Sequence, residues 1–84
     1  MAKMYTITRT THRTGGTATR VGTLAELLEC YSYTLEKGAS WQHEKGNAKI
    51  NRTPKTIKSL VSNLNNAVNN AAANGYAGED YSVM

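Results

Sequence analysis

Apolar and polar residues alternate along the first quarter of the chain, as in a β-strand with one buried face. In residues 4–11, MYTITRTT, Tyr5 and Ile7 alternate with threonines, and Thr, Ile and Tyr are favoured in strands. Residues 17–22, TATRVG, can return as a second strand, and GG at positions 15 and 16 accepts the positive φ angles of a tight turn. The pattern therefore predicts a β-hairpin.

Apolar residues three and four positions apart follow this hairpin and indicate an amphipathic helix. Thr23 and Glu26 match a capping box, in which each side chain binds a free backbone N–H of the first turn. Gly38 suits the left-handed residue that ends a helix. We therefore expect a helix over residues 24–37, with one apolar stripe made of Leu24, Leu27, Leu28, Tyr31 and Leu35.

The same spacing returns in the C-terminal half of the chain. Thr53 can cap a helix whose first residue is Pro54, because proline loses there only an N–H that has no partner. Asn74 and Gly75 form a stop signal. This second predicted helix buries a stripe made of Ile57, Leu60, Val61, Leu64, Val68 and Ala71.

The last residues alternate again and complete the predicted fold. Tyr81 and Val83 in YAGEDYSVM indicate a short strand that can join the hairpin. The order is then β-β-α-α-β, an α+β domain in which two helices pack on one face of a small antiparallel sheet. We expect one domain, residues 1–84, with a thin core, because a chain of this length buries only about 60 to 65% of its unfolded surface.

Charge is concentrated in one part of the chain. The formal net charge is +4, but residues 37–58 hold six Lys/Arg against a single acid, Glu44, which leaves a local charge of +5. The rest of the chain has four bases and five acids. Such a concentration is compatible with an anionic partner, although many small domains carry as much charge without binding nucleic acid.

Other features narrow the class of protein. Cys30 is the single cysteine, and no Cys/His spacing suits zinc, so we expect neither a disulfide framework nor a metal site. No signal peptide and no run of roughly 18 apolar residues is present. No nucleotide-binding glycine loop or Ser/His/Asp arrangement supports catalysis. The sequence predicts a non-enzymatic cytoplasmic protein without a cofactor.

The one tryptophan stands in the basic segment GASWQHEKGNAKINRTPKT, residues 38–56. With His43 beside it, Trp41 can form a stacking platform for a base, while neighbouring cations bind phosphate. Alternatively, Trp41 folds back over the helix ends and caps the core. The sequence leaves both interpretations open, as well as a mixture in which one ring face stays exposed.

Two lysines, Lys55 and Lys58, fall in the first turns of the second predicted helix, where the helix dipole disfavours cations. The free N–H groups there, with Arg52 nearby, suggest an anion site for a phosphate or for a carboxylate of a partner protein. A solvated surface without a partner is the competing interpretation. The candidate partner-binding residues are Trp41, His43, Lys45, Lys49, Arg52, Lys55 and Lys58.

Six asparagines occupy the second predicted helix, although asparagine is a poor helix former. Four of them share one face, where neutral donors and acceptors can read a partner surface: Asn63, Asn66, Asn70 and Asn74. The alternative is a solvated face on which asparagine has no particular role.

Two stretches also carry a resemblance. YTLEKGASWQHEKGNAKIN and PKTIKSLVSNLNNAVNNAAANGY, together roughly residues 31–76, resemble a group of small bacteriophage accessory proteins with a YTLExG pattern and an INxxPKTIKSLVxNLNxA pattern. The N-terminal hairpin matches them only in kind. The resemblance implies a phage protein that binds and inhibits a host enzyme or a defence complex, and it assigns no site residues.

Three hypotheses follow from the sequence. The first is a phage-encoded protein that binds and inhibits or redirects a host protein through its basic surface, with Trp41 as an aromatic anchor. The second is binding of a nucleic acid or a nucleotide signal by Trp41 and the nearby Lys/Arg residues. The third, self-assembly or homodimerisation through the unpaired edge of the sheet, stays open.

Overall fold

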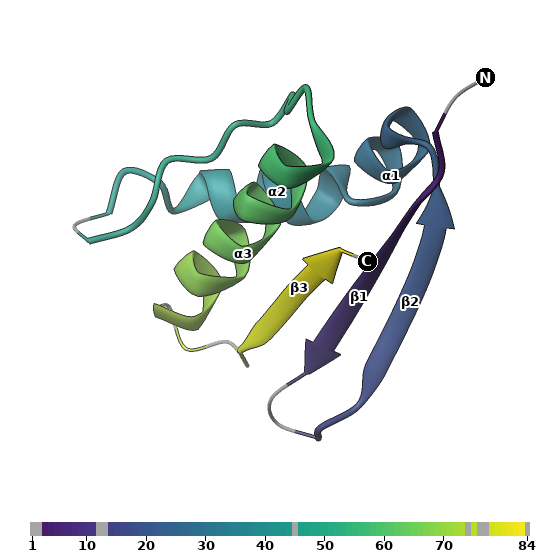
Figure 1. Cartoon of the computed structure of the whole chain (residues 1–84). Coiled ribbons are helices and arrows are strands. Elements are labelled where there is room, and N and C mark those ends of the chain that lie inside the picture. The colour runs from purple at the N-terminus through teal and green to yellow at the C-terminus, as the bar shows by residue number, and fades with distance from the viewer. Residues whose placement is uncertain (1–2, 12–13, 45, 74, 76–77, 84) are drawn as a thin grey trace.

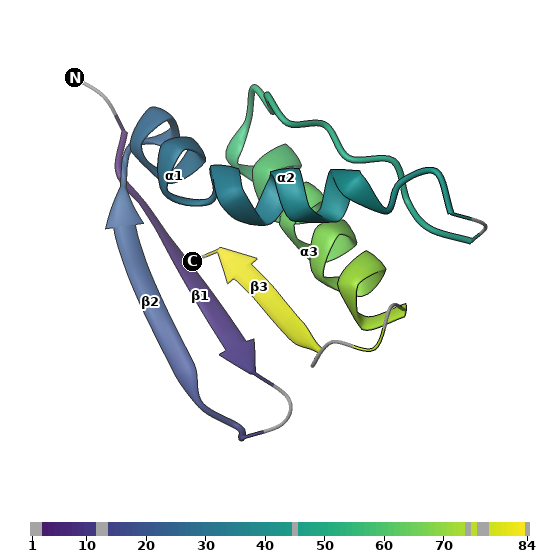
Figure 2. The same ribbon diagram turned by 180° about the vertical axis from the view of Figure 1, so that it is seen from behind.

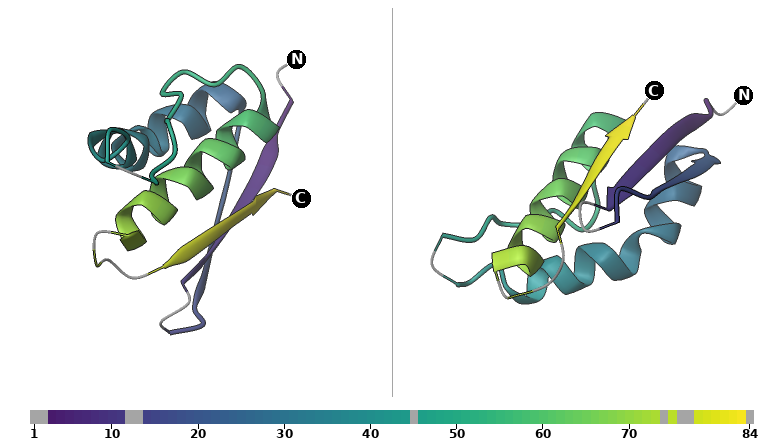
Figure 3. Two further views of the ribbon diagram at one scale, coloured as in Figure 1. Left: turned by 90° about the vertical axis from the view of Figure 1, so that its left-hand side faces the viewer. Right: turned by 90° about the horizontal axis from the view of Figure 1, so that it is seen from below.

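A three-stranded antiparallel sheet with helices on one face forms the fold. The structure is a computed structural model, and it describes residues 3–11, 14–44, 46–73, 75 and 78–83. The strand order is β2-β1-β3, and all labelled helices lie on the same side of the sheet (Figures 1 and 3). The predicted α+β class is confirmed. The elements are β1 (Tyr5–Thr11), β2 (Thr17–Gly22), α1 (Leu24–Cys30), α2 (Ser32–Ser40), α3 (Ile57–Ala73) and β3 (Glu79–Val83).

The hairpin forms where the alternating pattern predicts it. Ile7 of β1 lies opposite Arg20 of β2 and Val83 of β3, and its side chain is fully buried. Because side chains alternate along a strand, the odd-numbered residues of β1 face the helices with Ile7, and its threonines at positions 6, 8 and 10 face away. Of the two turn glycines, Gly15 has a positive φ of 69°, whereas Gly16 does not.

The predicted capping box at the start of α1 is present. Thr23 Oγ1 accepts the N–H of Glu26 at 3.2 Å, and the Glu26 carboxylate accepts the N–H of Thr23 at 2.9 Å. Hydrogen bonds from Thr23 to this carboxylate, from its backbone first and from its side chain second, favour the ionised form and lower the pKa of Glu26.

The prediction of one helix over residues 24–37 is wrong, because the chain bends at Tyr31 and remains helical to Ser40. At the bend, the Ser32 hydroxyl donates to the carbonyl of Glu29 at 2.9 Å, a local bond of the kind that bends helices. The Tyr31 ring contacts Tyr81 of β3 edge to face, with centroids 5.5 Å apart. This contact holds the bend against the sheet.

Gly38 lies inside α2 and does not end it, which corrects the prediction of a left-handed C-terminal residue. It is buried, and a Cβ at this position would collide with Ala67 of α3. The missing side chain lets α2 pack across α3 at short range (Figure 2). Glycine is needed here for the close approach of two helices.

The second helix begins three residues later than predicted. Thr56, and not Thr53, caps α3, since its Oγ1 accepts the N–H of the residue three positions later at 3.1 Å. Pro54 lies before the helix and is buried in the connecting segment. At the other end α3 stops near the predicted signal: Gly75 has a φ of 93°, and Asn74 lies outside the described residues.

The core lies between the helix layer and the sheet, and both predicted apolar stripes contribute to it. One member, Ile50, comes from the irregular segment between α2 and α3. Burial, with a smaller effect from the charge of Glu79, raises the pKa of the Tyr81 phenol in this core. The buried apolar residues are Ile7, Leu27, Leu35, Ala39, Ile50, Leu60, Leu64, Ala67, Val68 and Tyr81.

The close contact of α2 with α3 can be tested by adding one methyl group. Gly38→Ala is expected to lower the free energy of unfolding by roughly 1 to 3 kcal/mol, as overpacking a core does, because the new methyl meets Ala67. Urea unfolding followed by far-UV circular dichroism measures this loss. The new methyl would also collide with the Ala67 Cα, so removing the Ala67 methyl in an Ala67→Gly background should not restore the lost stability. A loss of less than about 0.5 kcal/mol for Gly38→Ala would contradict the interpretation.

Candidate functional site

The segment between α2 and α3 carries most of the predicted basic residues. Residues 47–56, called here the basic loop, include Lys49, Arg52 and Lys55. The loop contains no helix or strand, and it runs back along α3 toward the start of that helix (Figures 1 and 2). Its backbone N–H and C=O groups therefore need partners other than those of regular secondary structure.

Two asparagines of α3 provide these partners. Asn70, 2% exposed, accepts the N–H of Ala48 at 2.9 Å and donates to the Ala48 carbonyl at 2.8 Å. It also donates to the carbonyl of Gly38 in α2 at 3.2 Å. Asn63 accepts the N–H of Asn51 at 2.7 Å and donates back to α3 itself. These contacts, called here the asparagine clamp, give the loop the hydrogen bonds that a neighbouring strand would give.

The asparagine clamp corrects both interpretations of the predicted asparagine face. Asn63 and Asn70 are buried and bonded within the chain, so they neither read a partner surface nor sit on a solvated face. Asn66 is half-buried, and Asn74 lies outside the described residues. The sequence did carry a signal, because a poor helix former that recurs within a helix indicates a side-chain role.

Asn65, on another side of α3, bonds the sheet in the same way. Its Oδ1 accepts the N–H of Tyr81 at 2.7 Å, and its Nδ2 donates to the Tyr81 carbonyl at 3.0 Å. Tyr81 stands on β3, the edge strand farthest from β2. The side chain therefore occupies part of an edge that is otherwise open to another chain, which the sequence did not predict.

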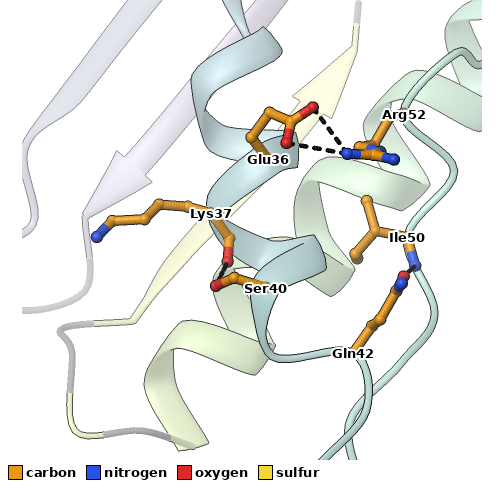
Figure 4. Close-up of polar contacts among 6 residues, drawn as sticks. All are labelled: Glu36, Lys37, Ser40, Gln42, Ile50 and Arg52. Atoms are coloured by element: carbon orange, nitrogen blue, oxygen red, sulfur yellow. Dashed lines mark hydrogen bonds and ion pairs between the residues drawn. The ribbon is translucent and has the colours of Figure 1, made fainter.

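Ile50 and Gln42 complete the attachment of the basic loop. The Gln42 Oε1 accepts the N–H of Ile50 at 3.2 Å (Figure 4). The Ile50 side chain is 6% exposed and belongs to the core. An apolar side chain inside a polar segment was the sequence signal for this anchor. The loop is thus held by buried apolar surface as well as by hydrogen bonds.

The predicted cations differ in their surroundings. Arg52 Nη1 lies 3.0 Å from both carboxylate oxygens of Glu36 on α2 (Figure 4). This ion pair is exposed and contributes only about 0.2 to 1 kcal/mol. Lys49 and Lys55 are exposed on the same loop, and hollows on the surface there are lined by Lys49, Ile50, Asn51, Arg52, Thr53, Lys55, Thr56, Ser59 and Asn63.

Two other predicted site residues, Lys58 and His43, do not line these hollows. Lys58 is exposed on α3, but with 3.6 residues per turn it stands about 140° around the helix from Asn63, which faces the loop. His43 is exposed in the turns that follow α2. Lys45 lies outside the described residues. The predicted anion site at the helix start is also altered, because Thr56 binds one of the N–H groups it would use.

Trp41 is half-buried at the end of α2, which agrees with the mixed interpretation. It lines a mostly apolar groove of about 300 Å³, and the Lys37 ammonium lies 5.7 Å from the centre of its ring. Figure 4 shows Lys37 leaving α2 on the side away from the Glu36–Arg52 pair. The other described residues that line the groove are Tyr33, Thr34, Ala67, Val68, Ala71 and Glu79.

This geometry separates the aromatic ring from the basic loop. None of Lys49, Arg52 and Lys55 is among the described residues that line the groove of Trp41. The structure therefore does not bring Trp41 together with the cations that the sequence predicts to bind phosphate. The described residues hold two distinct features, a clamped basic loop and an apolar groove.

The described residues show few other functional features. No three His, Cys, Asp or Glu side chains among them come together as ligands for a metal ion. No helix in the described part of the chain has both the length and the apolar character that crossing a bilayer requires. Comparisons with family models, curated proteins and solved structures yield no match.

The asparagine clamp predicts a large difference between two neighbouring asparagines of α3. Asn70→Ala is expected to lower the free energy of unfolding by at least about 2 kcal/mol, because it leaves the N–H and the carbonyl of Ala48 without a partner and removes a hydrogen bond to Gly38. It should also speed hydrogen exchange at the Ala48 amide. The matched control Asn69→Ala, at an exposed position, should change stability by less than about 0.5 kcal/mol. Similar effects of both substitutions would refute the clamp.

Proposed function

We propose that the chain is a non-enzymatic bacteriophage accessory protein that binds a host protein or defence complex in the bacterial cytoplasm and inhibits or redirects it. The basic loop would contact acidic residues of that partner. The observation that carries the proposal is the asparagine clamp, which ties the backbone of an irregular, positively charged segment to α3.

The attachment of the basic loop to α2 and α3 supports a binding role. A segment that only keeps the protein in solution does not need buried side chains to hold its backbone. Ordering a flexible loop on association lowers affinity, so a loop ordered beforehand binds at a smaller entropic cost. Asn63, Asn70 and Gln42 hold the backbone on both sides of Lys49.

Charge on the loop supports an acidic protein surface as the partner. Lys49 and Lys55 are exposed, and no carboxylate of a described residue forms an ion pair with either. Complementary charge speeds association and orients the two proteins, while apolar anchors provide much of the affinity. Trp41 and Tyr33, which is 71% exposed, offer such an anchor on the neighbouring groove.

Nucleic-acid or nucleotide binding has less support. It relies on several cations next to a stacking ring, but Lys37 is the one Lys or Arg among the described residues that line the groove of Trp41. Affinity capture with and without nuclease can separate a protein partner from a nucleic acid, because nuclease removes only the nucleic acid.

Affinity capture from a bacterial lysate tests the proposal. After nuclease treatment, the tagged protein is expected to retain one host protein at stoichiometric yield. Lys49→Glu combined with Lys55→Glu should abolish this retention, because the reversed charges repel an acidic surface. Lys3→Glu combined with Lys58→Glu changes the net charge equally and should retain the partner. Loss on nuclease treatment, or equal loss with both double variants, would count against a protein partner on the basic loop.

Trp41 provides a second test with the captured partner. Trp41→Ala is expected to weaken binding at least about tenfold, as loss of an aromatic anchor does. Because the ring is only half-buried, the melting temperature should fall by no more than about 4 to 8 °C, which corresponds to roughly 1 kcal/mol in a domain of this size. Calorimetry measures both quantities. Unchanged affinity would remove the groove from the interface, and a collapse of the melting temperature would assign Trp41 to the core.

A further inference from the structure

The helices leave part of the helix-facing side of the sheet uncovered. α1 lies near the Gly22 end of β2, and the strand continues past the helices toward the hairpin turn (Figures 1 and 2). Gly22 is buried, whereas the other residues of β2 are exposed. Side chains on this part of the sheet therefore face the helix layer without being covered by it.

Two arginines come together on this uncovered part. Arg9 of β1 lies opposite Ala18 of β2, and Arg20 of β2 lies opposite Ile7. Because Ile7 points into the core, the alternation of side chains directs both arginines to the helix side of the sheet. The small side chain of Ala18 leaves a hollow of about 90 Å³, lined by Arg9, Ala18, Thr19, Arg20 and Tyr31.

Among the described residues, these two guanidinium groups have no acidic partner. Within the part of the chain that the structure describes, no carboxylate forms an ion pair with Arg9 or Arg20. Arg20 Nη1 lies 3.8 Å from Sγ of Cys30, which is only a weak acceptor. Glu79 shares this face of the sheet, but it lies opposite Thr11 and lines the groove of Trp41. Arg9 and Arg20 are diagonal neighbours across β1 and β2, within reach of each other's long side chains, and a bound anion would offset the repulsion between their charges.

We propose that this hollow binds a single phosphate group of a phosphomonoester. The guanidinium group presents planar pairs of N–H donors that match phosphate oxygens. A phosphomonoester carries a charge of about −1.5 to −2 at pH 7, close to the sum of two guanidinium charges, whereas a diester carries about −1. The hollow has the volume of about three waters at roughly 30 Å³ each, which suits one phosphate group and not a nucleobase.

This site is independent of the basic loop. Arg9 and Arg20 stand on the hairpin, whereas Lys49 and Lys55 stand between α2 and α3. Either site can therefore fail its test without affecting the other. Tyr31, which forms one wall of the hollow, is positioned by its contact with Tyr81.

The test is an NMR titration of the full chain, labelled with nitrogen-15, at constant ionic strength. Inorganic phosphate and phenyl phosphate are expected to cause saturable shifts of the amides of Arg9, Ala18 and Arg20, with dissociation constants of about 10 mM or lower. Tighter binding of phenyl phosphate would identify an organic monoester as the ligand, and equal binding would identify free phosphate. Dimethyl phosphate, a diester, should bind several-fold more weakly. Shifts that do not saturate, or equal binding of the diester, would overturn the proposal.

Matched variants assign the binding to these residues. The double variant Arg9→Gln, Arg20→Gln should weaken phosphate binding by about tenfold or more. The control Lys49→Gln, Lys55→Gln removes the same charge and should weaken phosphate binding by less than about twofold. The double variant Arg9→Lys, Arg20→Lys keeps both the charge and a long side chain. It tests whether the planar pairs of N–H donors of arginine are needed, and it can be used if the glutamine variant does not fold. It should bind several-fold more weakly than the native chain. Equal effects of the two glutamine variants, or native affinity in the lysine variant, would overturn the site.

Discussion

The hydrogen bonds of Asn70 join three parts of the molecule that no regular secondary structure connects. One buried carboxamide binds the Ala48 backbone in both directions and also reaches the Gly38 carbonyl on α2. This arrangement depends on the close approach of α2 to α3, which the missing side chain of Gly38 permits. Buried backbone groups without partners cost about 1 to 3 kcal/mol each, so the loop takes this path only because the carboxamide lies beside it. That constraint sets the position of Ala48, while Asn63 and Gln42 hold the residues of the basic loop that follow it.

Local patterns in the sequence predicted those parts of the fold that local physics determines. The capping box of Thr23, the apolar stripes and the alternating strands each depend on residues close in sequence, and each appears in the structure. Gly38 shows where this reasoning ends. Its lack of a Cβ suits a left-handed helix end and a close helix contact equally well, and only the presence of Ala67 opposite decides between them. The bend at Tyr31 likewise involves a contact with Tyr81, fifty residues later in the sequence.

The candidate site was predictable in composition but not in arrangement. The charge count located the basic segment, and the run of asparagines indicated that α3 has unusual side-chain requirements. Which way these groups face depends on the bend and on the rotation of each helix about its axis, and neither can be read from spacing alone. For this reason Trp41 and Lys49, eight residues apart in the sequence, belong to different surface features. Asn70, in contrast, is twenty-two residues from Ala48 and binds it directly.

The geometry of the clamp explains why Lys49 is presented to solvent. Asn63 and Asn70 are seven residues apart on α3, which is about 10.5 Å along a helix axis. Their partners, Ala48 and Asn51, are three residues apart, and an extended chain covers about 10 Å over that interval. The two lengths match, so the segment between the anchors is held extended, with successive side chains on opposite sides. Ile50 points into the core, and Lys49 must therefore point outward. A helix with polar side chains two turns apart thus acts as a template that sets the direction of a charged residue on a loop.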